Sequence, residues 1–211
     1  MPVTYTNKEA IANRALLLLG GNGIVSFDDE TTESNLVSQV YSDYIQFLLS
    51  TGSWRFAMKK QQLTQLDEDP INEWTYSYTL PSDFLKLRSL FNSSQVGART
   101  IIDYELYQNR RVYTNETSLY ADYLSYPDES YWPHYFVEFV INALAYQLAY
   151  PLTRDQNLQE YYKQQAFGSA AENWQGGLYA IASQADSASN PSEPLNLSYL
   201  ANARHAFYGS N

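Results

Sequence analysis

Apolar positions recur at helical spacing near the start of the chain. Over residues 32–50, Leu, Val, Tyr and Phe side chains return at three- and four-residue steps, which gives one apolar face. A shorter helix before it is expected to stop at the glycine-rich residues 20–23, which suit a left-handed helix end. The first 53 residues therefore predict a helical pair.

Helical spacing returns in the second half of the chain. Residues 133–151 are apolar almost all round, so this helix is expected to lie at the centre of a bundle. A last long helix is expected over about residues 155–183, with Gly176 and Gly177 weakening or bending it. Residues 133–183 thus predict a second helical pair.

Between these pairs the pattern changes to alternation. Large side chains occupy every second position in two segments: Trp54, Phe56 and Met58, and then Trp74, Tyr76, Tyr78 and Leu80. Period two places such side chains on one face of an extended strand, and residues 67–70 between them favour a turn. A hairpin with one buried face is expected, followed by short strands at about residues 85–91, 100–106, 111–114 and 119–126.

Together these patterns predict an α+β, mainly α fold. Its body is a four-helix bundle of residues 1–53 and 133–183, with a β-rich antiparallel insertion over 54–132. Residues 184–211 are expected to form a flexible linker and an extended C-terminal arm, because residues 184–194 are polar and aperiodic. The arm carries the apolar residues Leu195, Leu197, Tyr199, Leu200, Phe207 and Tyr208. It either docks on another protein or folds back on its own subunit.

Charge and composition narrow the function classes. The net charge of −10 argues against a module that grips nucleic-acid phosphates. Acidity would suit the wall of a DNA channel, which must not bind DNA, or a surface kept acidic for solubility. The 20 tyrosines favour protein interfaces or a tyrosine-rich β-domain. The longest apolar run, residues 15–19, is far too short to span a membrane.

No pattern of catalytic or ligand-binding residues stands out. The chain has no cysteine, and its two histidines lie in different regions, so no metal or cofactor site is expected. Acidic triplets at residues 28–30 and 67–69 lie in predicted loops and lack the spacing of a calcium loop. The sequence therefore predicts a protein that is not an enzyme.

The two aromatic segments also resemble a known family. Trp54-Arg55-Phe56-Ala57 is followed by Trp74-Thr-Tyr76-Ser-Tyr78-Thr-Leu80-Pro81-Ser-Asp83-Phe-Leu85. Their order and spacing resemble the tail tubular protein A family of short-tailed bacteriophages, the head-to-tail adaptors. The resemblance continues through residues 112–114, 136–150 and 161–163 and covers roughly residues 5–183, whereas residues 92–100 and those beyond 184 match no motif of the family.

The resemblance implies a structural protein of the virion neck. About twelve copies would form a ring between the portal protein and the tail nozzle protein after assembly in the host cytoplasm. DNA would pass through the ring without specific binding. The apolar arm, residues 195–208, is the candidate contact with the portal, and the insertion is expected to contact neighbouring subunits or the nozzle.

Other functions remain open at this point. A tail-associated carbohydrate-active enzyme would need two carboxylates that converge in a cleft. A host- or carbohydrate-binding module would expose Trp54 and Trp74 on a shallow surface, whereas an adaptor is expected to bury them. A different head-completion protein with a similar ring role would differ mainly in topology.

Overall fold

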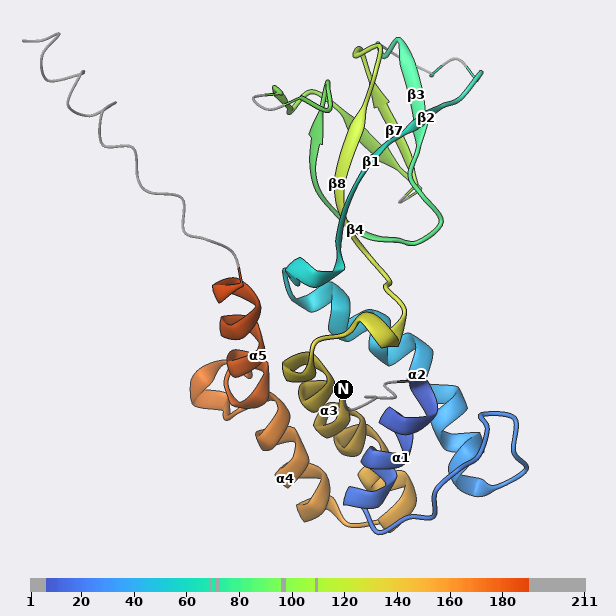
Figure 1. Cartoon of the computed structure of the whole chain (residues 1–211), viewed down its shortest axis with the longest axis vertical. Coiled ribbons are helices and arrows are strands. Elements are labelled where there is room, and N and C mark those ends of the chain that lie inside the picture. The colour runs from blue at the N-terminus through green and yellow to red at the C-terminus, as the bar shows by residue number, and fades with distance from the viewer. Residues whose placement is uncertain (1–6, 69, 71–72, 96–97, 109, 190–211) are drawn as a thin grey trace, which may run out of the picture.

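The chain folds into a helical lobe and a β lobe (Figure 1). The computed structural model describes residues 7–68, 70, 73–95, 98–108 and 110–189. Over these residues it contains five α-helices and two four-stranded antiparallel sheets. The expected four-helix bundle with a β-rich insertion is therefore wrong. The last expected helix is two helices, and the middle of the chain builds a two-sheet lobe with its own core.

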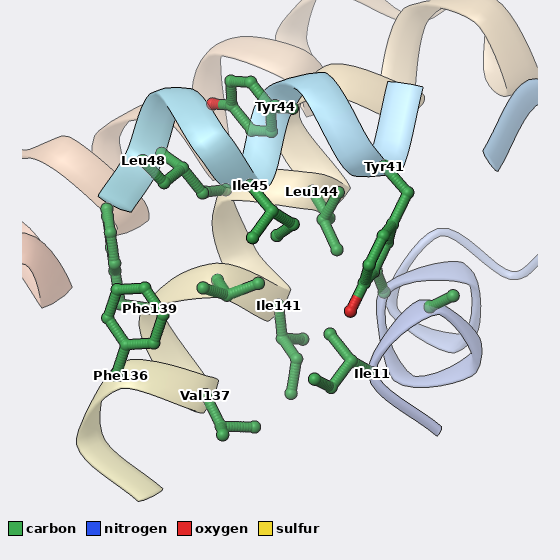
Figure 2. Close-up of a cluster of buried hydrophobic side chains, with 14 of the residues drawn as sticks. Ile11, Tyr41, Tyr44, Ile45, Leu48, Phe136, Val137, Phe139, Ile141 and Leu144 are labelled. Carbon is green, nitrogen blue, oxygen red and sulfur yellow. The ribbon is translucent and has the colours of Figure 1, made fainter. Parts of the chain in front are cut away.

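The helical lobe surrounds one central helix. Its elements are α1 (Lys8–Leu18), α2 (Thr32–Thr51), α3 (His134–Thr153), α4 (Gln156–Phe167) and α5 (Gly177–Ala188). Helix α3 contacts each of the other four, which confirms the central place predicted from its apolar surface. Figure 2 shows side chains of α1, α2 and α3 pointing toward one another, among them Ile11, Ile45 and Ile141.

The expected single helix over residues 155–183 is interrupted for nine residues. Helix α4 ends at Phe167, its C-cap Gly168 has a positive φ of +77°, and a short 3-10 turn, η3 (Ala170–Glu172), precedes α5. A Cβ on Gly168 would lie 2.7 Å from the Cα of Gly176, so the two backbones meet where no side chain fits. Helix α5 then continues to Ala188, and the first residues of the expected linker are helical.

Replacing Gly168 with alanine is expected to lower the free energy of unfolding by about 2 kcal/mol or more, because left-handed strain and backbone overlap add. Gly20→Ala is the matched control, since Gly20 has a similar φ of +70° but nothing within 4 Å of its Cβ position. That variant should cost about 1 kcal/mol. Urea denaturation followed by helical circular dichroism compares the two. If both variants lose the same free energy of unfolding, the backbone at Gly168 and Gly176 can move apart at no measurable cost.

The β lobe consists of two sheets that enclose a second core. One sheet has the order β1-β8-β4-β5 and the other β2-β3-β7-β6. The strands are β1 (Met58–Gln62), β2 (Thr64–Gln65), β3 (Tyr76–Thr79), β4 (Phe84–Phe91), β5 (Thr100–Ile101), β6 (Glu105–Tyr107), β7 (Arg111–Thr114) and β8 (Tyr120–Ser125). Tyr78, Leu90 and Val112 lie between the sheets, so side chains of both fill this core.

The hairpin expected from the two aromatic segments is only partly present. Strand β2 pairs with β3 through Thr64 and Thr79, but β1 pairs with β8 instead. Trp54 and Phe56 are not in a strand, because residues Arg55–Ala57 form a 3-10 turn, η1. Two chain segments join the lobes, one running from α2 through η1 into β1 and one running from β8 back to α3 (Figure 1).

Candidate functional site

The residues of the two aromatic segments lie in two places. Trp54 and Phe56 lie at the joint between the lobes, packed in the core of the helical lobe. Tyr76, Tyr78 and Leu80 belong to the β-lobe core. The structure therefore brings these residues together as two structural clusters and not as one site.

Trp54 holds several elements at the joint. Its side chain is 1% exposed, and its Nε1–H donates to the carbonyl oxygen of Leu48 in α2 at 3.1 Å. Its ring lies 4.9 Å from Phe136 and 6.0 Å from Phe139, both in α3, and 5.8 Å from Tyr179 in α5, between ring centroids. A buried indole in such a cluster cannot stack on a sugar ring.

The second aromatic segment stabilises the β lobe. The hydroxyl of Tyr78 donates to the carbonyl oxygen of Glu116 at 2.8 Å, and the half-buried Trp74 donates from Nε1 to Glu105 Oε2 at 3.0 Å. Asp83 accepts from Lys59 Nζ at 2.6 Å and from the Tyr123 hydroxyl at 3.0 Å. Pro81 begins the turn before β4, since its carbonyl oxygen accepts from the backbone N–H of Phe84 at 3.2 Å.

A buried aspartate in α5 fastens that helix to the joint, and sequence reasoning missed it. Asp186 is 3% exposed. Its Oδ2 accepts from the backbone N–H of Arg55 at 2.6 Å, and its Oδ1 accepts from the Tyr135 hydroxyl of α3 at 2.9 Å and from the Phe56 N–H at 3.5 Å. One carboxylate thus connects α5, α3 and η1.

The chemistry of this contact keeps Tyr135 protonated. Burial, and then the hydrogen bond to Asp186, raises the pKa of the Tyr135 hydroxyl to about 12. The phenol therefore stays a hydrogen-bond donor at neutral pH, as the carboxylate requires. The contact therefore acts as a structural hydrogen bond between α3 and α5.

Beside this contact lies a basic hollow. Three exposed cations, Arg55, Lys86 and Arg88, line a cavity of about 390 Å³ together with Ser187 of α5. Lys86 Nζ reaches the carbonyl oxygen of Ser50 at the end of α2 at 3.4 Å, and Arg88 lies 3.8 Å from Asp122. In a chain with a net charge of −10, this hollow is a place where acidic groups of a partner can pair.

The acidic loops serve local structure. Asp29 Oδ2 accepts from the backbone N–H groups of Val25 and Ser26 at 2.8 and 3.0 Å, which closes the loop between α1 and α2. Glu68 pairs with Arg111 at 2.7 Å. Within the described part of the chain, no three acidic, histidine or cysteine side chains gather as a metal site would require.

The apolar arm, Leu195 to Tyr208, lies outside the described residues. The chain matches no protein-family model, and no curated protein matches it significantly. Among the described residues, no helix combines the length and the apolar character needed to cross a membrane.

Proposed function

We propose that the chain is a head-to-tail adaptor of a phage virion. About twelve copies form a ring between the portal protein and the tail nozzle protein, and the ring extends the channel through which DNA passes. The protein is not an enzyme, needs no cofactor, and resides in the virion neck after assembly in the host cytoplasm. The likeness of residues 54–85 to the tail tubular protein A family is the starting point.

The observation that carries this proposal is the fixed base of the arm. Helix α5, the last described element, is fastened at the lobe joint by Asp186, so the chain leaves the described structure from a helix that is held in place. Docking through such an arm orders a peptide at an entropic cost, so one contact is weak. When such weak contacts are repeated around a ring, they act at high effective concentration, and the interface between the ring and the portal becomes hard to open.

The basic side chains at the junction between the lobes also support the proposed contact with the portal. The basic hollow of Arg55, Lys86 and Arg88 is also lined by Ser187, which lies in the last turn of α5. Acidic side chains of the portal can pair there while the arm docks, and the negative charge of the remaining chain discourages contact with DNA. A host-binding module receives no comparable support, because Trp54 is buried.

Electron microscopy of the protein mixed with its portal tests the proposal. The protein alone is expected to be largely monomeric, and portal particles are expected to gain a closed ring of density. Portal particles that stay bare at saturating protein would defeat the adaptor function.

Removing residues 190–211 tests the role of the arm separately. The truncated chain should remain folded, because Asp186 and the rest of α5 stay in place. Its affinity for the portal should fall at least about tenfold, since the repeated arm contacts are lost. Sedimentation with portal particles measures this, and circular dichroism checks the fold. Undiminished binding would remove the arm from the interface.

A further inference from the structure

An aromatic groove lies on the helical lobe, and Tyr179, which also packs against Trp54 at the joint, forms part of its lining. It is a hollow of about 410 Å³ with a mainly apolar lining. Its ring-bearing lining residues are Tyr44, Phe47, Tyr146, Phe167, Trp174 and Tyr179, which come from α2, α3, α4, the segment before α5, and α5. Figure 2 shows Tyr44 on the other side of the α2 ribbon from Ile45, and Tyr44, although buried, borders the groove.

Trp174 is held over this groove at a conformational cost. Asn173 and Trp174 both have left-handed backbones, with φ of 53° and 57°, which costs of order 1 kcal/mol for a residue with a side chain. Lys163 Nζ lies 3.7 Å from the centroid of the Trp174 ring and stabilises it by a cation–π contact. Strain of this kind persists where surrounding contacts impose it, and here it directs an indole to the rim of an apolar hollow.

The groove suits the side chains of an extended apolar peptide. Phe47 is 54% exposed although it lines the hollow, so a large apolar surface faces water. Aromatic pockets with a few polar groups at the rim are typical sites for Leu and Tyr side chains of a docking segment. Gln147, Lys163 and Gln175 provide the polar rim.

We infer that the groove binds residues 195–200 of its own chain. Tyr179 of α5 lies ten residues before Ser189, the residue that caps the end of this helix, which corresponds to about 15 Å along the helix axis. Residues 190–194 can span about 16 Å when extended, enough to return along α5 to the groove. Leu195, Leu197 and Tyr199 then follow at alternate positions, which places all three on one side of an extended peptide.

In dilute solution, the groove is expected to bind the segment of its own chain in preference to that of a second copy. A short tether gives the segment an effective concentration in the millimolar range, far above that of separate chains. The bound segment covers Phe47 and Trp174 and withholds the arm from other partners. This inference does not rest on the adaptor function, because it concerns the isolated chain alone.

A disulfide in the full-length protein tests this inference. The chain has no cysteine, so Gln175→Cys at the groove rim and Ser198→Cys in the segment provide a single possible pair. If the segment occupies the groove, the two Cα atoms come within the roughly 7 Å that a disulfide needs, and mild oxidation yields an intramolecular link in most molecules. Non-reducing electrophoresis and peptide mass analysis identify the link.

Two matched variants make the outcome decisive. Gln62→Cys with Ser198→Cys places the first thiol on the exposed β1 strand of the β lobe, and its link should form at least about fivefold more slowly. Adding Leu197→Ser and Tyr199→Ser to the groove pair should slow its link by a similar factor. Links between different chains would assign the groove to a second copy and overturn the inference. Equal rates for the groove and β1 pairs would also overturn it.

Discussion

Replacing Trp54 with alanine is expected to lower the free energy of unfolding by about 3–5 kcal/mol, the range for deleting a large buried aromatic side chain. The indole packs on Phe136, Phe139 and Tyr179 and donates to Leu48, so its loss opens a cavity where α2, α3 and α5 meet. It also leaves a carbonyl oxygen near the end of α2 without this partner. Urea denaturation followed by circular dichroism at a helical wavelength measures the cost.

Trp74→Ala is the matched control for this substitution. Trp74 belongs to the other aromatic segment but is only half-buried, and its indole N–H donates to Glu105 in the β lobe. Its loss should cost about 1–2 kcal/mol, because less surface returns to water. A Trp54 variant no less stable than the Trp74 variant would contradict the role of Trp54 as the joint between lobes.

Sequence patterns located the long helices well. The helix expected over residues 32–50 is Thr32–Thr51, and that expected from residue 133 to 151 is His134–Thr153. Both have apolar faces that persist over five turns, so the periodic signal outweighs local preferences. Pro151 does not end α3 where expected, because the helix continues two residues beyond it to Thr153.

The short alternating pattern of residues 54–58 predicted a strand, but the chain there forms the 3-10 turn η1. Trp54, Phe56 and Met58 alternate, yet Ala57 is as buried as Trp54, and the two are three residues apart. Residues three apart share a face of a 3-10 turn, and η1 has this geometry. Three alternating positions are too few to separate a strand from such a turn. The 3-10 turn is favoured here because Trp54 packs against side chains of α3 and α5.

The contact made by Asp186 could not be read from local sequence. Its backbone partner Arg55 is 131 positions away, and its surroundings are rich in Ser and Ala, which indicated a linker. One signal was present: Leu178, Ala182 and Asp186 follow each other at four-residue steps, so they share one helix face. A carboxylate in line with apolar residues indicates a buried polar contact, provided the helix is recognised first.

Replacing Asp186 with alanine is expected to cost about 3 kcal/mol and to loosen α5 from the joint. The substitution leaves the partly buried N–H of Arg55 and hydroxyl of Tyr135 without this acceptor, and hydrogen bonds to a charged group are among the stronger ones. Hydrogen exchange of α5 amides should accelerate more than that of α1 amides, because α5 loses its hydrogen bonds to α3 and η1 while α1 makes no hydrogen bond to Asp186. Mass spectrometry of peptic fragments resolves the two helices.

Asp155→Ala separates the effect of burial from that of helix capping. Asp155 also accepts two backbone hydrogen bonds, from Asn157 and Leu158 at the start of α4, but it is exposed. Water can replace its carboxylate, so the cost should be about 1 kcal/mol.

Adding Tyr135→Phe to Asp186→Ala should recover part of the free energy lost in the Asp186 variant, since the phenylalanine has no hydroxyl left unpaired. Equal costs for the two aspartates, with α5 exchange unchanged, would show that Asp186 does not hold α5 at the junction between the lobes.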